Sequence, residues 1–349
     1  MFDLDSLKAI EHLDRQRVSE RLRALPEEIA AFIKTAEKIK KLKTWQHINR
    51  VVILGMGGSG IAGEIAKNIV DFEGSIPVTS IHDTSLPNYI DQQTLVIGVS
   101  FSGSTAETLI SVKKAIEQGA PTVLICHEDS PLDILSIEHN LPVFHVTSPE
   151  PPRFATANLL VPILIILDRV GALSEVSKNL TTASSELTTL REQIKPTKIT
   201  QENNAKQLAT TLHGKIPLIL SAPGISSTSL RFAQSMNENA KSYAFYYPVS
   251  EFAHNMIEAR EKENPFYYVI VRSSFEDRFI DHAFTAIQKG LERDGIPYIT
   301  VQLEGKTLLS QLLYGLSFFD YVSYYAALLK KENPHYIDNI EFYKKHLKK

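Results

Sequence analysis

A short apolar run enters a glycine-rich loop at residues 51–64, which read VVILGMGGSGIAGE. The β-branched residues at 51–54 are typical of a buried parallel strand, and residues 61–70, after the glycines, have the character of a helix. Glycines allow the backbone to approach a neighbour closely, and the start of a helix offers free N–H groups to an anion. This stretch therefore predicts one strand–loop–helix unit of an α/β fold, with a loop suited to binding.

The alternation of strands and helices continues through the first half of the chain. We predict further strands at residues 95–99, 122–126 and 143–146. Helices at residues 106–118 and 155–170 separate or follow these strands, and such alternation predicts a parallel sheet with helices on both faces. Residues 46–195 are therefore expected to form a first α/β subdomain.

The second half repeats this pattern after a connecting helix and linker at residues 171–200, where Pro196 marks the expected boundary. We predict strands at residues 218–220, 243–247, 267–272 and 297–303. The predicted helices lie at residues 228–241, 276–293 and 307–330. Residues 196–349 are expected to form a second subdomain, and the two similar halves indicate a duplicated fold with three αβα layers in each.

The N-terminal 45 residues differ from both halves. They are rich in Leu, Glu, Lys and Arg at helical spacing, so we predict an arm of two helices that is broken near Pro26. The basic stretch at residues 38–43 is short and interrupted by apolar residues, and we interpret it as a solvated helix face. A helical arm of residues 1–45 is thus expected outside the main core.

The composition is that of an ordinary globular protein. Of 349 residues, 43% are hydrophobic and 22% are charged, which excludes a disordered or collagen-like chain. Lysine and arginine number 37 against 40 acidic residues, and this balance gives no support to nucleic acid as a partner. The acidic residues 1–5 do not resemble a signal peptide, and the apolar segment 154–167 is shorter than the about 20 residues that a membrane span needs. We expect a cytoplasmic protein that acts without a membrane.

The sequence has one cysteine, Cys126, which excludes an internal disulfide and a cysteine-rich metal site. Because it follows an apolar run, we expect a buried structural thiol. The HExxH and Walker A patterns are absent from the sequence, and no ligands cluster at metal-binding spacing. We therefore expect neither a metal nor another cofactor.

Two loops in the first half point to phosphate. Residues 55–60 satisfy the G-x-G-x-x-G pattern of dinucleotide-binding proteins, and Asp83 lies near the position of the acidic residue that such proteins use. Residues 100–105 read SFSGST and also lead from a predicted strand into a helix. Four hydroxyl groups in this loop exceed what an N-cap requires, and they suit a small phosphorylated ligand at the carboxyl edge of the sheet. We favour such a ligand over a dinucleotide.

The second half contains two candidates for acid–base chemistry. Arg231, Ser235 and Glu238 have the spacing i, i+4 and i+7, which places them on one polar stripe of the predicted helix. A polar stripe of this kind is usually solvated. His254 lies in the loop EFAHN at residues 251–255, where a histidine is more often structural than catalytic. From the residues alone, Glu238 and His254 are candidates for proton transfer and no more.

Five motifs in chain order resemble a known family. They are GMGGSGIAGE at 55–64, SFSGSTAET at 100–108, PPR at 151–153, NENA at 237–240 and EFAHN at 251–255. From about residue 45 to its end, the chain is similar to the bifunctional phosphoglucose/phosphomannose isomerases of the sugar isomerase (SIS) domain superfamily. The serine loop is typical of SIS domains in general, whereas the motifs that contain Glu238 and His254 are more specific to the isomerases.

This resemblance implies two SIS subdomains, each a five-stranded parallel sheet flanked by helices, with a hexose 6-phosphate bound between them. It implies that the two loops hold the phosphate, through Gly58, Ser59, Ser100, Ser102 and Thr105. It also implies a homodimer with a shared active site, in which the histidine comes from across the interface.

The resemblance further implies the catalytic residues. Glu238 matches the base, His254 the residue that opens the sugar ring, and Arg153 the residue beside the enediol. A lysine near the C-terminus belongs to the family's site, and Lys344 is its best match. The implied reaction interconverts glucose 6-phosphate, and mannose 6-phosphate as well, with fructose 6-phosphate and needs no cofactor.

Three positions depart from the family pattern. Ser104 stands where the family often has Asn, and Glu64 stands where it often has Asp. Ile337 falls near the expected place of a small hydroxyl residue that is linked to accepting both C2 epimers. Three other interpretations are weighed: a non-catalytic SIS module that senses sugar phosphates, a glucosamine 6-phosphate synthase fragment, and a nucleotide-binding dehydrogenase.

Overall fold

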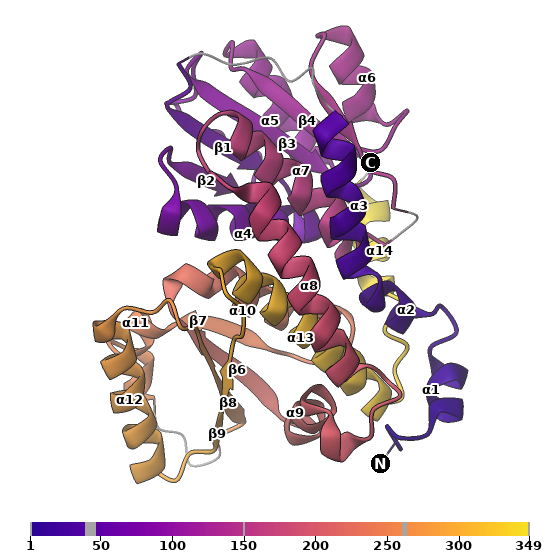
Figure 1. Ribbon diagram of the computed structural model, residues 1–349, viewed down its shortest axis with the longest axis vertical. Coiled ribbons are helices and arrows are strands. Elements are labelled where there is room, and N and C mark those ends of the chain that lie inside the picture. The colour runs from indigo at the N-terminus through magenta and orange to yellow at the C-terminus, as the bar shows by residue number, and fades with distance from the viewer. Residues whose placement is uncertain (1, 39–46, 149–150, 260–263, 348–349) are drawn as a thin grey trace. The chain divides into compact units, whose positions relative to one another are not determined.

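Residues 2–38, 47–148, 151–259 and 264–347 are described by the computed structural model (Figure 1). Contacts divide the chain into two compact units. The first unit is Leu25–Ser184, and the second unit combines Met1–Ala24 with Ser185–Lys349. The sequence analysis set its boundaries after residues 45 and 195, and the division by contacts differs because the first two helices of the chain pack with the C-terminal half.

The first unit contains a five-stranded parallel sheet in the order β2-β1-β3-β4-β5. Its strands are β1 (Arg50–Leu54), β2 (Val78–Ile81), β3 (Thr94–Ser100), β4 (Thr122–Cys126) and β5 (Val143–His145). Its helices are α3 (Leu25–Lys38), α4 (Gly57–Glu73), α5 (Ala106–Glu117), α6 (Pro131–Glu138) and α7 (Thr156–Arg169), with a 3₁₀ turn η1 (Pro152–Phe154). The five-stranded parallel sheet flanked by helices is confirmed. The analysis missed β2 and α6, which are short.

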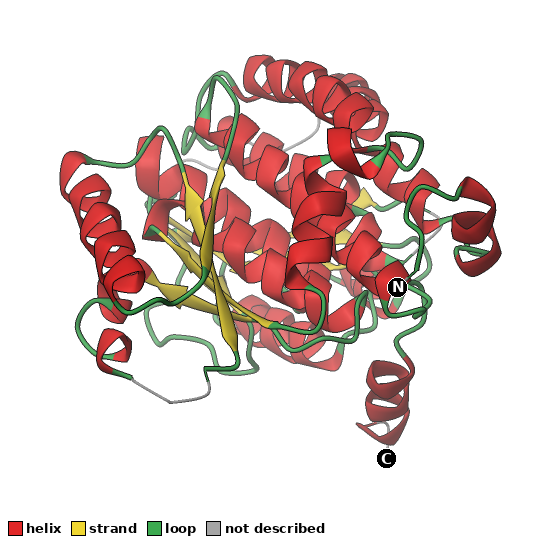
Figure 2. Cartoon of the chain, turned by 90° about the horizontal axis from the view of Figure 1, so that it is seen from below, coloured by secondary structure: helices red, strands yellow, loops and turns green. Residues whose placement is uncertain are grey.

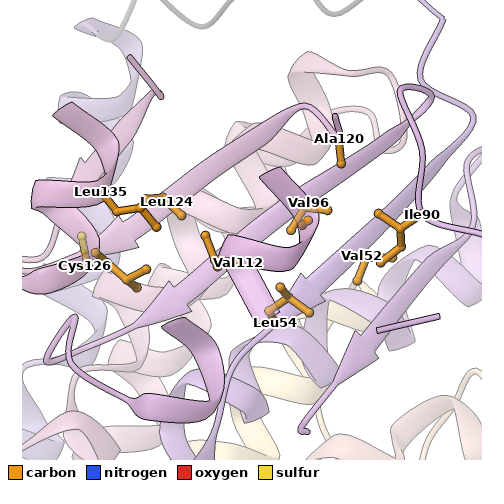
Figure 3. Packing of buried hydrophobic residues seen from close by; sticks show 11 residues of the cluster. Val52, Leu54, Ile90, Val96, Val112, Ala120, Leu124, Cys126 and Leu135 are labelled. Carbon is orange, nitrogen blue, oxygen red and sulfur yellow. The ribbon is translucent and has the colours of Figure 1, made fainter. Parts of the chain in front are cut away.

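Strands buried on both faces form the core of this unit. Every residue of β3 and β4 is buried, as expected where helices cover both sides of a sheet. On one face, Val52, Val96 and Leu124 pack with Val112 of α5 (Figure 3), and each such burial contributes about 1.5–3 kcal/mol. Cys126 belongs to this cluster and is 0% exposed, and burial raises the pKa of its thiol to about 11. The prediction of a buried thiol is confirmed.

The second unit contains a four-stranded parallel sheet in the order β7-β6-β8-β9. Its strands are β6 (Ile216–Ser221), β7 (Phe245–Pro248), β8 (Phe266–Arg272) and β9 (Tyr298–Gln302). The implied five strands are wrong for the described part of this unit, because β9 is followed by a long helix and not by another strand–helix pair.

The second unit also contains helices, which Figure 2 draws in red. They are α1 (Leu7–Leu13), α2 (Val18–Arg23), α9 (Asn204–Leu212), α10 (Ser226–Glu238), α11 (Val249–Phe252), α12 (Arg278–Arg293), α13 (Leu308–Leu329) and α14 (Asp338–Leu347). The connecting helix α8 (Val176–Ile194) begins in the first unit and ends in the second. α10 packs on β6 and β7 and also along α13, and this contact later positions part of the candidate site.

One helix of the described chain, α13, is long and apolar enough to cross a membrane by its length and composition. Yet 94% of its most apolar window is buried inside the protein, against α9 and α10. Its single charged residue, Asp320, lies 3.1 Å from the guanidinium of Arg231 on α10. α13 is therefore the core helix of the second unit.

The N-terminal arm departs from its prediction. Residues 2–38 contain three helices in place of the predicted two: a break at Ala24 lies close to Pro26, as predicted, and a further break falls at residues 14–17. Asp14 accepts hydrogen bonds there from the N–H groups of Val18 and Ser19, at 2.7 and 3.0 Å. Pro26 is the second residue of α3, where proline is tolerated because first-turn N–H groups have no helical partner. Most of the basic stretch, residues 39–43, lies outside the described residues.

Candidate active site

Close contacts at its glycines shape the loop between β1 and α4. A Cβ on Gly58 would lie 3.1 Å from the carbonyl oxygen of Pro152, and one on Gly60 would lie 2.7 Å from Nδ1 of His82. α4 begins at Gly57, earlier than the predicted residue 61, and Gly57 has a φ of +54°, which favours glycine. Neighbours within the chain thus account for the glycine pattern without a dinucleotide.

A buried hydrogen bond joins this loop to the serine loop. The N–H of Phe101 donates to Oγ of Ser59 at 3.2 Å, and both residues are buried. The two loops follow β1 and β3, which are neighbours in the sheet. Their attachment at the carboxyl edge of adjacent parallel strands is the arrangement in which α/β proteins bind ligands.

The hydroxyl groups of the serine loop do not serve as a helix cap. Thr105 occupies the N-cap position of α5, but its side chain makes no capping hydrogen bond. Its Oγ1 lies 2.9 Å from Oγ of Ser100. Ser102 and Ser104 are exposed, and Oγ of Ser104 donates to Oγ of Ser102 at 3.0 Å. The N-cap interpretation therefore does not explain this cluster.

Arg153 lies beside the first loop. It belongs to η1, and its Cα lies 3.4 Å from where a Cβ on Gly58 would be. The residue is 3% exposed, and its guanidinium carbon lies 4.7 Å from the centre of the Phe154 ring. The first unit therefore brings the backbone of the PPR motif against the glycine loop. The order of the motifs along the sequence does not reveal this contact.

The sequence analysis did not single out His82, which packs against the same loop. Its Nδ1 lies 2.7 Å from the Gly55 carbonyl oxygen, and its Nε2 lies 2.8 Å from Oε1 of Glu64. The hydrogen bond to the Glu64 carboxylate raises the pKa of His82. Burial has the largest single effect on Glu64 and acts to raise its pKa, but the hydrogen bonds from His82 and Ser80 and the charges of His82 and Lys67 together outweigh it, so the net shift is downward. The raised pKa of His82 and the lowered pKa of Glu64 both favour an imidazolium paired with a carboxylate.

Glu238 is the last residue of α10, and a buried polar network fixes the helix before it. The interpretation of the stripe as solvated is wrong for Arg231 and Ser235, which are 2% and 0% exposed. Oγ of Ser235 donates to Oδ1 of Asp320 at 2.5 Å, and Arg231 lies 3.1 Å from the same oxygen. Directly after Glu238, the Asn239 amide donates to a serine hydroxyl of α13 at 2.9 Å. α13 therefore determines where Glu238, itself half-buried, is held.

His254 sits on a turn that its neighbours hold in place. The Phe252 ring is 1% exposed and anchors α11 in the core. Asn255 accepts a hydrogen bond from the Tyr247 hydroxyl at 3.0 Å and donates to the Glu251 carboxylate at 3.3 Å. His254 itself is exposed. The EFAHN motif thus combines one core residue and one turn-forming residue with an accessible imidazole.

Lys344 lies on α14, near the C-terminal end of the described chain (Figure 2). Residues 341–347 are all exposed. Lys344 is in the last turn of this helix, with Lys345 and His346, where cations interact favourably with the helix dipole.

The two units thus divide the predicted residues. The first unit brings together the loops that carry Gly58, Ser59, Ser100, Ser102 and Thr105, and it places the backbone at Arg153 against them. The second unit carries Glu238, His254 and Lys344. In the described ranges, no group of three or more His, Cys, Asp or Glu side chains is placed to hold a metal ion.

Comparison with known families finds two matches. The SIS domain model matches residues 46–166, and the model described as the bacterial phospho-glucose isomerase C-terminal SIS domain matches residues 201–347. Together these matches account for most of the chain and confirm the resemblance that the motifs indicate.

Individual relatives agree with these matches. A bifunctional phosphoglucose/phosphomannose isomerase of Caldicellulosiruptor bescii is 29% identical over 332 residues, covering 93% of this chain and 96% of the relative. A protein of the same name from Aquifex aeolicus is 28% identical, covering 86% of this chain and 90% of its own length. Among solved structures, a hypothetical protein of Thermus thermophilus has the same fold, with a TM-score of 0.77 at 16% identity over 98% of this chain and 94% of its own.

Proposed function

Because the chain belongs to the SIS domain superfamily and is similar to bifunctional phosphoglucose/phosphomannose isomerases over nearly its whole length, we propose that it interconverts glucose 6-phosphate and fructose 6-phosphate. The protein is a sugar-phosphate isomerase, and the assignment of substrate and catalytic residues is the proposal. Mannose 6-phosphate is the second proposed substrate, because it leads to the same enediol as glucose 6-phosphate.

Binding starts at the phosphate. The N–H groups at the start of α4 and α5 and the hydroxyls of Ser100, Ser102 and Thr105 offer several donors to one phosphate group. Ser59 ties the two loops together through the N–H of Phe101, and its own hydroxyl hydrogen is free to donate in the direction of a ligand. In this proposal the two loops hold the phosphate end of the sugar.

The chemistry moves hydrogen between C1 and C2. The hexose ring must open first, and an imidazole such as that of His254 transfers a proton to or from the ring oxygen near neutral pH. The Glu238 carboxylate then removes the proton from C2, which gives a cis-enediol, and returns it to C1. One carboxylate on one face of the planar intermediate serves both steps, and such acid–base assistance contributes about 10²- to 10⁴-fold in rate.

Charge develops on the enediolate oxygens during this transfer. An arginine stays protonated throughout, so Arg153 would stabilise this charge without exchanging a proton. Lys344 is the proposed lysine of the same site. The aldehyde carbon is reduced as its neighbour is oxidised, so the reaction balances within the sugar and needs no external redox cofactor.

Several further features are part of this proposal. We propose a cytoplasmic homodimer in which the partner subunit contributes the histidine to the site. Acceptance of mannose 6-phosphate requires the C2–C3 bond to rotate, so that either C2 hydrogen can reach the same base. Ile337, half-buried just before α14, falls near the expected place of the residue that the family resemblance links to that acceptance.

The observation that supports the proposal best is the serine loop. Its hydroxyls do not cap α5, and a buried hydrogen bond attaches the loop to the glycine loop at one sheet edge. A helix cap would need one hydroxyl, whereas a phosphate with several oxygens accounts for the whole set.

A coupled assay tests the proposal. Fructose 6-phosphate formation is followed from glucose 6-phosphate and, separately, from mannose 6-phosphate, with the wild type and Glu238→Gln. We expect the wild type to be active and the variant to lose turnover while it still binds 5-phosphoarabinonate. Binding without turnover in the wild type would favour the non-catalytic sensor, and unchanged turnover in Glu238→Gln would remove this residue from the mechanism.

A further inference from the structure

A histidine that the proposed chemistry does not use lies against the first phosphate loop. His82 follows β2, and its ring makes two short contacts. Nδ1 lies 2.7 Å from the carbonyl oxygen of Gly55, and Nε2 lies 2.8 Å from Oε1 of Glu64, on the second turn of α4. Oγ of Ser80 is a more distant neighbour of Nε2, at 3.4 Å.

These contacts determine the protonation state of the ring. A carbonyl oxygen only accepts, so Nδ1 of His82 must carry a hydrogen toward Gly55. If Nε2 carried none, its lone pair would face the Glu64 carboxylate at 2.8 Å. An imidazolium and a carboxylate satisfy both contacts, and their hydrogen bond is charge-assisted. The geometry therefore favours a positively charged His82.

The ring also packs directly on the loop. A Cβ on Gly60 would lie 2.7 Å from Nδ1 and 2.9 Å from Cε1 of His82. Gly55 and Gly60 are the first and last glycines of the loop, so one ring contacts both of its ends. The segment that carries His82 also holds Gly55 through its backbone, because the N–H of Gly55 donates to the carbonyl oxygen of Ile81 at 3.2 Å. Movement of the ring would change the shape of the loop.

We propose that His82 is a positioning residue that holds residues 55–60 in their anion-binding shape, and that its protonated ring strengthens phosphate binding by this loop. The inference rests on the proposed function, because it takes the loop to be a phosphate site. His82 acts through the loop backbone and through its charge near the start of α4, where positive charge adds to that of the helix N-terminus. It does not have to touch the substrate.

The charged group that acts on His82 is Glu64. In the described residues, Glu64 faces it from α4, and Lys67, one turn further along α4, is paired with Asp71 and acts on Glu64. Residues 51–60, which form most of β1 and the glycine loop, carry no titratable side chain. The carboxylate of Asp83, the next residue in the chain, accepts hydrogen bonds from the N–H and hydroxyl groups of Thr84.

Sulfate binding as a function of pH tests the proposal. Sulfate keeps its charge between pH about 5.5 and 9, so any pH dependence of its affinity comes from the protein. Affinity is measured by calorimetry for the wild type, His82→Gln and Glu64→Gln. His139→Gln is the matched control, because His139 is an exposed histidine of the same unit. The ionisation of His82 itself is followed by NMR of the labelled imidazole.

We expect wild-type affinity for sulfate to fall about three- to tenfold as the pH rises through the titration of His82. His82→Gln should bind weakly throughout and lack this step, Glu64→Gln should move the step to lower pH, and His139→Gln should behave as the wild type. The proposal is overturned if His82→Gln keeps the same step, if NMR shows a neutral ring at pH about 6.5, or if the wild type binds no sulfate.

The isomerase assay separates this proposal from the proposed function. A protein that shows the pH step in sulfate binding but does not isomerise any hexose 6-phosphate would refute the function and leave the role of His82 intact. An active isomerase whose sulfate affinity and KM are unchanged by His82→Gln would support the function and refute the role of His82. Should His82→Gln not fold, Glu64→Gln and the NMR titration still decide the question.

Discussion

Replacement of Gly60 by Ala tests whether contacts within the chain account for the glycine loop. A Cβ there would lie 2.7 Å from Nδ1 of His82 and 2.9 Å from the Gly55 carbonyl oxygen, whereas ordinary contacts begin at 3.4 Å. The ring must retreat by the difference between 2.7 and 3.4 Å, about 0.7 Å, and this breaks its hydrogen bond to Gly55. Overpacking costs about 1–3 kcal/mol and the lost bond about 0.5–1.5, while alanine gains about 1 from helix propensity. We expect a net loss of about 0.5–3.5 kcal/mol.

Gly290→Ala is the matched control for this substitution. Gly290 also lies inside a helix, α12, but a Cβ there would meet nothing within 4 Å. Only the propensity gain applies, so this variant should be more stable than the wild type by about 0.5–1 kcal/mol. Urea unfolding of both variants measures the two free energies. If Gly60→Ala is as stable as the wild type, or changes in the same direction as Gly290→Ala, the close contact with His82 does not constrain the loop.

Further expectations concern binding, ring opening, pH and packing. Ser102→Ala should raise KM for glucose 6-phosphate about tenfold with little change in kcat, as steady-state kinetics will show, because it removes one phosphate donor. His254→Ala should lose activity on the cyclic substrate and retain part of it on open-chain analogues, and equal losses on both would contradict ring opening. His82 stabilises the fold fully below its ordinary pKa of 6.5 and loses this effect as the pH rises through its raised pKa. Glu64 stabilises the fold fully above its ordinary pKa of 4.5 and loses this effect as the pH falls through its lowered pKa. Thermal unfolding should therefore show a stabilised window between pH 4.5 and 6.5 that His82→Gln lacks. Asp320→Asn should cost about 3–5 kcal/mol in urea unfolding, because it removes the negative charge from a buried ion pair, and a loss below about 1 kcal/mol would contradict this.

The parallel sheets could be predicted because their strands are buried on both faces. Residues 51–54, 95–99 and 122–126 are continuous apolar runs, and each ends at a turn or a helix that the local sequence also marks. The strand β2 was not predicted because only Val78 in it is fully buried and its sequence VTSI contains no long apolar run. An edge strand of this kind forms because it pairs with β1, and the local sequence pattern carries no information about that pairing.

The missing fifth strand of the second unit has a similar origin. The resemblance transferred a strand count from the family, whereas the chain after β9 turns into α13, which is buried along nearly its whole length. A helix apolar on every side is expected in the core of a unit. The sequence showed this apolar segment, but its partner helices α9 and α10 become evident only once the chain is folded.

The candidate residues also divide into those that a local sequence pattern reveals and those whose role depends on distant partners. The hydroxyls of residues 100–105 were found because four of them lie within this short stretch of sequence and exceed the local requirement for a cap. Asp320 was not found, although it is the one charged residue in the sequence of α13, because its role depends on Arg231, which is 89 residues away. The stripe on α10 was interpreted as solvated for the same reason. Periodicity shows which residues share a face, but not whether that face meets water or another polar surface.

The glycine loop shows how far a local motif can specify chemistry. Its pattern satisfies a dinucleotide fingerprint, yet Gly58 and Gly60 are explained by contacts with Pro152 and His82, from two other segments of the chain. A glycine indicates that another group approaches the backbone closely, but it does not indicate whether that group is a pyrophosphate or a side chain. The distinction came instead from the second loop, whose hydroxyls exceed the needs of a helix cap and whose backbone donates to Ser59. If both loops bind the phosphate, as we propose, a substitution that separates them should weaken phosphate binding even where every donor is retained.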